Sequence, residues 1–134
     1  MKTFYAPPDV VAAIVQWLRG HEIDARSLVP NPRASGMVRV SRIGGAPRSL
    51  VQDEAEVLIE VWHTDQGDGF DLAQAIWVLI AAVEEQDEIS GLITHHIEPT
   101  SSVLQFPDED APDMERHQIT CRLLVGMSEI EVPA

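Results

Sequence analysis

The side chains best suited to bind a metal ion in this sequence are five histidines and one cysteine. His95 and His96 are adjacent in a segment of extended character, so their side chains point to opposite faces of a strand and cannot easily share an ion. The sequence has neither the H-x-x-x-H nor the C-x-x-C spacing that brings two metal ligands together. Cys121 falls on the apolar side of an alternating pattern, which is typical of a small core residue. We therefore expect no metal site and no cofactor.

Motifs for nucleophilic catalysis and phosphate binding are also missing from the sequence. A G-x-S-x-G turn, which exposes a serine nucleophile, does not occur. Gly44-Gly45 is not followed by the lysine of a phosphate-binding loop. Asp65, Asp68 and Asp71 lie close together and could hold a cation, but helix capping explains two of them. We therefore expect no catalytic residues and predict that the protein is not an enzyme.

One central unit organises the chain, and it begins with a strand. Residues 55–63 alternate between apolar and polar side chains, which predicts a half-buried strand with Trp62 on its polar side. Residues 92–98 also have extended character. If these two strands are neighbours in one sheet and run parallel, the segment between them is a crossover helix packed on that sheet.

That helix is predicted over residues 69–86. Its apolar residues recur at spacings of three and four, and Trp77 is one of them. Asp68 is placed to cap the helix, and Asp71 adds negative charge to its first turn. We expect Trp77→Asp to prevent folding, because it would put an unpaired charge on the buried side.

The remaining segments predict one more helix and two more strands. Prolines followed by an aspartate open a helix near 9–19. Strands are expected near 37–43 and 116–126, and the glycine- and proline-containing run 44–47 ends the first. An antiparallel hairpin with a long tip then joins 37–43 to 55–63.

The expected fold class is α+β, in one domain over residues 1–134. It has a four-stranded mixed or antiparallel sheet flanked by two main helices, in the order αββαββ. Residues 1–7 form a loose N-terminal arm, and 99–115 form a long acidic loop of the kind that is usually functional or mobile. Residues 127–134 form a C-terminal tail that is either disordered or used for assembly.

Charge is distributed unevenly along the chain. The net charge of −13 argues against a nucleic-acid-binding surface. Residues 1–50 hold seven basic and three acidic groups, or +4, whereas residues 51–134 hold two basic and nineteen acidic groups, or −17. No apolar run approaches the roughly 20 residues of a membrane span, so we expect no membrane partner. A chain with such polarity can associate head to tail with copies of itself.

Candidate subunit-interface residues follow from this charge split. The basic candidates are Arg39, Arg42 and Arg48. The acidic candidates at the end of the long helix are Glu84, Glu85, Asp87 and Glu88. A second acidic set, in the long loop, is Asp108, Glu109, Asp110 and Asp113. Pairing of the arginines with Glu56 and Glu60 inside one subunit remains an alternative, chiefly for Arg39. We expect reversal of Arg42 and Arg48 to Glu to leave folding intact and to abolish assembly.

Several short segments carry a family resemblance. They are the first helix from Pro8-Asp9-Val10 to Trp17-Leu18-Arg19, the segment Val29-Pro30-Asn31-Pro32-Arg33, the strand Val38–Gly45, the strand Val57–Trp62 before an alanine-rich helix, and the strand Arg116–Gly126. In these segments and in element order the chain resembles tail terminator proteins of long-tailed, siphovirus-type bacteriophages, as found in actinobacteriophages.

This resemblance implies a structural virion protein of the tail and neck, assembled in the host cytoplasm. Such proteins form a homo-oligomeric ring, typically a hexamer, that caps the tail tube, ends its polymerisation and joins it to the head connector. The implied partners are further copies of the chain, the tail tube protein and a head-side connector or stopper. DNA passes through the lumen without specific binding. The acidic loop is then a candidate contact for the tail or the connector.

Three alternatives to this interpretation remain. A different neck protein, such as a head-side stopper or adaptor, belongs to the same assembly and shares the same pattern. A small acidic binding protein, such as an inhibitor that mimics nucleic acid, requires an exposed acidic face. An enzyme is the third alternative, although no motif supports it.

Overall fold

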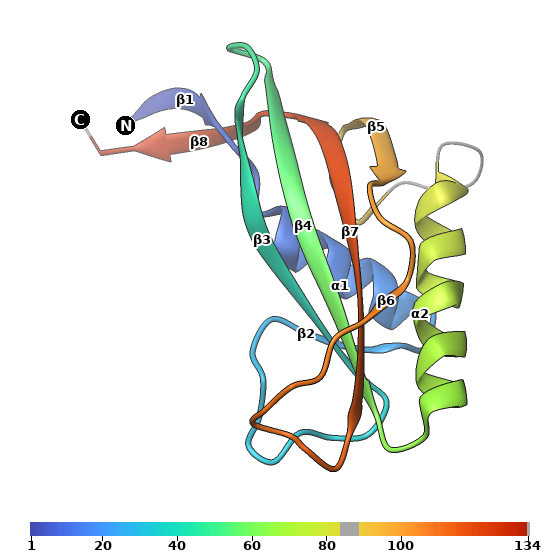
Figure 1. Cartoon of the computed structure of the whole chain (residues 1–134). Coiled ribbons are helices and arrows are strands. Elements are labelled where there is room, and N and C mark those ends of the chain that lie inside the picture. Colours follow the sequence, from blue (N-terminus) through green and yellow to red (C-terminus); the bar gives the residue numbers. More distant parts are fainter. Residues whose placement is uncertain (84–88, 134) are drawn as a thin grey trace.

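The computed structural model describes residues 1–83 and 89–133, and a mixed β-sheet forms its body (Figure 1). Over the described residues this sheet has six strands, in the order β2-β3-β4-β7-β5, with β6 also paired to β7. The strands are β2 (Asp24–Arg26), β3 (Met37–Pro47), β4 (Gln52–His63), β5 (Thr94–Pro99), β6 (Leu104–Gln105) and β7 (Glu115–Gly126). The β2–β3 pair is parallel, and the other pairs are antiparallel.

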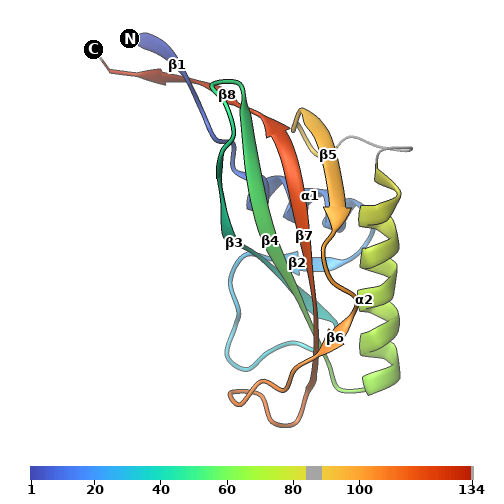
Figure 2. The same cartoon turned by 45° about the horizontal axis from the view of Figure 1, so that its top comes forward.

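Two helices cover one face of this sheet in the described part of the chain. They are α1 (Val10–Gly20) and α2 (Gln66–Ala81). In Figures 1 and 2 both helices lie on the same side of the sheet. Their apolar residues join those of β3, β4 and β7 in one core, which includes Ile14, Leu18, Val40, Ile59, Ile76, Ile80, Ile119 and Leu123. Burial of this apolar surface is the main stabilising contribution to the fold.

Each helix begins at an aspartate cap. The side chain of Asp9 accepts a hydrogen bond from the backbone N–H of Ala12 at 3.0 Å, at the start predicted for the first helix. The second helix is capped by Asp65, which accepts from the N–H of Asp68 at 2.8 Å. The prediction of Asp68 as the cap was therefore wrong, and the helix begins at Gln66 instead of residue 69. The helix ends at Ala81, short of the predicted residue 86, and residues 84–86 of the predicted range lie outside the described residues.

The predicted four-stranded sheet in the order αββαββ is wrong. Within the described residues the element order is β1-α1-β2-β3-β4-α2-β5-β6-β7-β8. The strands near 55–63 and 92–98 do run parallel in one sheet, but β7 lies between them. The added strands β2 and β6 are only three and two residues long. Segments this short have too few residues for a period-two pattern, and their partners in the sheet make them strands.

The β3–β4 hairpin is longer than predicted. The glycines at 44 and 45 do not end β3, because a β-bulge between Arg42 and Gly44 takes up a residue and pairing continues to Pro47. Gly45 has φ +98°, and a Cβ there would lie 2.0 Å from the carbonyl oxygen of Glu54. This position therefore requires glycine, and the hairpin tip is reduced to residues 48–51.

The segments predicted as a loose arm and a tail pair with each other. Strands β1 (Lys2–Ala6) and β8 (Ser128–Val132) form a separate, two-stranded antiparallel sheet. We call this sheet the terminal ribbon. It projects from the body beside the tip of the β3–β4 hairpin, on the side away from α2 (Figures 1 and 2).

Candidate interaction surfaces

Arg39 lies on the sheet face that the helices leave open. Its guanidinium is 3.7 Å from a carboxylate oxygen of Glu60, its partner residue on β4. Glu60 is 5% exposed and also accepts a hydrogen bond from Nε of Arg116 at 2.9 Å. The structure thus places Arg39 in a cross-strand ion pair within one subunit. About 39% of its side chain is still exposed.

Arg42 lies on the opposite face of the same strand. Because strand residues alternate between faces, Arg42 shares the helix-covered side with the buried Val38 and Val40. Its guanidinium donates to both carboxylate oxygens of Asp53, at 2.7 and 3.2 Å. Asp53 is fully buried. This bidentate pair is part of the folded structure of one subunit, so Arg39 and Arg42 do not form one basic surface.

Arg48 is at the exposed tip of the hairpin. One guanidinium nitrogen is 3.5 Å from a carboxylate oxygen of Glu54, and 62% of the Arg48 side chain is exposed. The Glu54 carboxylate is also 3.4 Å from Nε of the Arg122 guanidinium. A second nitrogen of that guanidinium is 3.4 Å from a carboxylate oxygen of Glu98. Exposed pairs of this kind contribute about 0–1 kcal/mol each. Of the three predicted arginines, Arg48 has the most side-chain surface left for a neighbouring molecule.

The acidic candidates predicted at the end of the long helix belong to a part of the chain that the structure does not describe. Glu84, Glu85, Asp87 and Glu88 lie outside the described residues.

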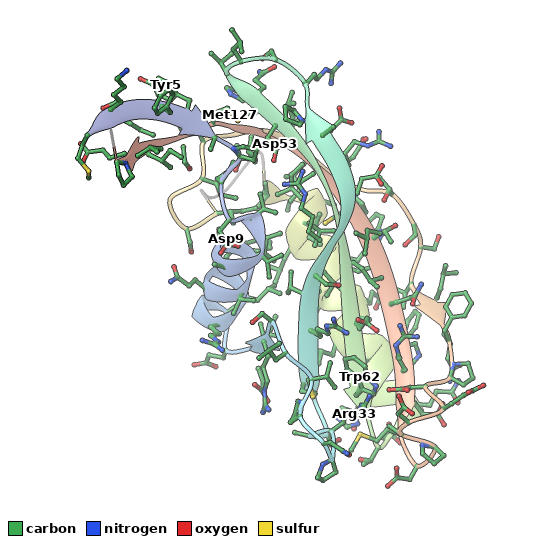
Figure 3. The ribbon with its side chains drawn as sticks, turned by 90° about the vertical axis from the view of Figure 1, so that its left-hand side faces the viewer. Tyr5, Asp9, Arg33, Asp53, Trp62 and Met127 are labelled. Carbon is green, nitrogen blue, oxygen red and sulfur yellow. The ribbon has the colours of Figure 1, made fainter. Side chains whose placement is uncertain are left out.

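The second acidic set lies in a loop that packs against the open face of the sheet. Trp62 points to this face and is only 2% exposed, because the segments around Val29 and Ala111 cover it. Its indole N–H donates to Asp108 at 2.9 Å, and Asp108 is also 3.2 Å from the guanidinium of Arg33. Figure 3 shows Trp62 and Arg33 together at the end of the sheet opposite the terminal ribbon.

Asp108 therefore fastens the loop over Trp62. Its partial burial opposes ionisation, but the Trp62 hydrogen bond, the backbone N–H of Asp110 and the charges of Arg33 and Arg116 outweigh this and lower the pKa of the Asp108 carboxyl. The other predicted loop residues are exposed, and these are Glu109, Asp110 and Asp113. Asp108 is thus a structural group, and the other three carboxylates are accessible on an anchored loop.

An apolar groove runs along the outer side of α2. It has a volume of about 1030 Å³ and is lined by Phe70, Trp77 and Val78 of the helix, with Ile23 and Val103 from neighbouring segments. The Trp77 N–H donates to the carbonyl oxygen of Ser101 at 2.9 Å. Trp77 was predicted to lie on the fully buried side of the helix. Trp77 is only partly buried, and it contacts the core and also lines the groove. The side of α2 that faces the core directly carries Ala73, Ile76 and Ile80, which are fully buried.

The terminal ribbon exposes further apolar side chains. Phe4, Tyr5 and Ile130 are 49%, 66% and 40% exposed. The backbone N–H of Met127, just before β8, donates to the carbonyl oxygen of Val51 at 3.0 Å and ties the base of the ribbon to the hairpin tip. The sequence interpretation missed these residues. The alternation of Glu129 with Ile130 is the signal that could have identified β8.

Burial is the main cause of the pKa shifts of Cys121 and His117. Burial raises the pKa of the Cys121 thiol to about 12, which keeps it protonated and unreactive. Burial also lowers the pKa of His117, which is 3% exposed beneath the start of α2. In the described part of the chain no three histidine, cysteine, aspartate or glutamate side chains are grouped as a metal ion would need. Neither α1 nor α2 is long and apolar enough to cross a lipid bilayer.

A scan against protein-family models and a search of curated proteins both found no match to this chain. The resemblance to tail terminators therefore stays a prediction from the sequence. The surfaces described above are the observations from which a function can be argued.

Proposed function

We propose that this protein is a structural component of the tail of a long-tailed bacteriophage, where it forms a ring that caps the tail tube and joins it to the head. The single observation that carries the proposal is the presence of two uncovered apolar surfaces on opposite sides of one subunit. These are the terminal ribbon and the α2 groove. Large uncovered apolar surfaces commonly mark protein–protein contacts.

Two different surfaces on opposite sides are what a ring requires. A symmetric dimer uses one patch twice, whereas a ring joins two different patches through a rotation that closes. The loop between β6 and β7 carries the exposed carboxylates Glu109, Asp110 and Asp113 and lies at the end of the sheet away from the ribbon, whereas the β3–β4 hairpin tip, which carries Arg48, lies at the ribbon end (Figure 1). A ring built from such subunits presents chemically different surfaces, which suits a tube on one side and a connector on the other.

The test is the mass and shape of the full-length protein in solution. The chain has a mass of 14.8 kDa. We expect light scattering to give an integer multiple of that mass, and negative-stain electron microscopy to show rings with a central hole. Rings that bind the ends of purified tail tubes identify a terminator, and rings that bind only DNA-filled heads identify a stopper or adaptor. A monomer at every accessible concentration would contradict the proposal and favour a small acidic binding protein.

A further inference from the structure

The terminal ribbon has one apolar and one polar face. Residues directly opposite each other in an antiparallel pair point to the same face, and successive residues alternate. One face carries four apolar side chains, a lysine and a serine, from the pairs Phe4–Ile130, Lys2–Val132 and Ala6–Ser128. The other carries polar side chains and a tyrosine, from the pairs Tyr5–Glu129 and Thr3–Glu131. A sheet with this pattern normally packs its apolar face against another surface.

The apolar face of the ribbon is not covered within one subunit. Phe4, Ile130 and Val132 are 49%, 40% and 38% exposed. The ribbon extends away from the helices and the main sheet, so its own body cannot cover it (Figure 2). A two-stranded ribbon alone is marginally stable in water at best. A surface outside the subunit that covers this face would therefore stabilise it.

The α2 groove matches this face in length and chemistry. Phe70 and Val78, which are 39% and 53% exposed, are about 12 Å apart along the helix at 1.5 Å per residue. Lys2 and Ala6 are about 13 Å apart along β1 at roughly 3.3 Å per residue. The ribbon face and the exposed side of α2 are thus of similar length.

On the apolar face of the ribbon the charge is opposite in sign to that of the groove, and Glu129 and Glu131 lie on the other face. Lys2 is on the apolar face of the ribbon, at its outer end. The groove is lined by two carboxylates, those of Glu22 and Asp71. A lysine brought to this rim meets charge of the opposite sign, which favours one orientation of the ribbon over its reverse.

We propose that the apolar face of the terminal ribbon of one copy packs into the α2 groove of the next copy, with Phe4 and Ile130 against Val78 and with Lys2 directed towards Asp71. The two surfaces are on opposite sides of the subunit, so the contact is heterologous and can repeat around a ring. This inference rests on the proposed ring function and names the contact that builds the ring.

The direct test is disulfide formation between two singly substituted full-length chains. Phe4→Cys is mixed with a differently tagged Val78→Cys and oxidised. Native Cys121 is buried and its pKa is raised to about 12, so it should not contribute. We expect a cross-linked heterodimer from this mixture. The matched control, Tyr5→Cys with Val78→Cys, should give little product because Tyr5 is on the other face of the ribbon.

The double variant Phe4→Cys/Val78→Cys should give a ladder of cross-linked species that ends at the ring's subunit number. A protein of ring mass that gives no Phe4–Val78 cross-link would overturn this contact while leaving the proposed function intact. A cross-linked dimer from Phe4→Cys alone would mean that two ribbons pair with each other, and would also overturn it. A protein that remains monomeric would overturn both.

A second measurement separates docking from simple ribbon folding. Phe4→Ser removes the largest apolar side chain that the ribbon contributes to the proposed contact and should weaken self-association on the order of 10- to 100-fold. The control Tyr5→Ser removes an aromatic ring from the polar face and should leave self-association within about 3-fold. Equal effects of the two variants would show that the face of the ribbon does not matter and would contradict the proposed contact.

Discussion

At the scale of single residues, Arg42 and Asp53 form an ion pair within the fold, so Arg42 contributes to the stability of one subunit. Asp53 is fully buried, and both of its carboxylate oxygens accept from the Arg42 guanidinium. Removal of one partner from such a pair leaves a buried charge uncompensated, which costs about 3–5 kcal/mol. Reversal of Arg42 to Glu would add a like charge beside Asp53. The structure therefore argues against our expectation that this reversal leaves folding intact.

We predict that Arg42→Met lowers the free energy of unfolding by about 3–5 kcal/mol, as measured by urea denaturation. The matched control is Arg48→Met. It removes the guanidinium of a side chain that is 62% exposed, and it should change the free energy of unfolding by about 0–1 kcal/mol. Arg48→Glu is also the cleaner probe of charge in assembly. Equal stability of the two methionine variants would show that Asp53 does not depend on Arg42.

His117 should make the stability of the protein pH-dependent. Its Nδ1 has no hydrogen-bond partner among the described groups. Its ring packs edge-on against the ring of Phe70, with 6.1 Å between the two ring centroids. Burial lowers the pKa of His117 below the ordinary 6.5, against a smaller opposing effect of Glu115. Between the lowered pKa and 6.5 the unfolded chain binds more protons than the folded one, so stability falls as the pH falls.

We predict that the melting temperature drops as the pH is lowered from about 7.5 to about 5, and that His117→Gln reduces this drop. The control is His95→Gln, because His95 is exposed. Differential scanning calorimetry at the two pH values measures the effect. A drop of the same size in His117→Gln and in the unsubstituted protein would rule out His117 as its source.

At the scale of elements, the pairing of β3 with β4 beyond the bulge depends on one glycine. A Cβ at Gly45 would lie 2.0 Å from a backbone oxygen of β4, and the φ of +98° is itself strained for other residues. We predict that Gly45→Ala lowers the free energy of unfolding by about 1–3 kcal/mol or more. Gly20→Ala is the control, because no atom lies within 4 Å of the added Cβ at the end of α1. Denaturation midpoints that are the same for both variants would contradict the backbone geometry described at Gly45.

The loop over Trp62 depends on Asp108. Asp108→Ala removes the acceptor of the buried indole N–H, which should cost about 1–3 kcal/mol and speed up hydrogen exchange of residues 106–114. Asp113→Ala, in the same loop but exposed, should change neither quantity measurably. Because the pKa of Asp108 is lowered, its contribution should be present above its ordinary value of 3.8 and be lost as the pH falls further. Unchanged exchange in Asp108→Ala would contradict the anchoring role.

At the scale of the whole molecule, the body and the terminal ribbon should be separable. The contacts between elements pair β1 with β8, and the continuous core contains no residue of either strand. We predict that removal of residues 2–6 and 128–133 leaves the body folded, with a melting temperature within a few degrees of the full chain. The same protein should be a monomer by light scattering. A truncated protein that still assembles would place the ring contacts elsewhere on the body.

The sequence by itself determined the elements that have a long and regular pattern. The alternation in 55–63 and 116–126 and the capped apolar stripe near 9–19 lie within β4, β7 and α1, because period and capping are local properties of the chain. The sequence also showed the separation of charge between its two halves.

The tertiary structure alone decided which of these residues meet. Asp53 is 11 residues from Arg42, Asp108 is 46 residues from Trp62, and the two strands of the ribbon come from opposite ends of the chain. Each of these contacts depends on strand order and register, which distant partners set and no local pattern encodes. The arginines predicted as one basic surface are found on two faces of β3 and at the hairpin tip, because Arg39 and Arg42 are three residues apart in a strand whose side chains alternate between faces. A charge count along the sequence carries no information about which face of a strand a side chain occupies.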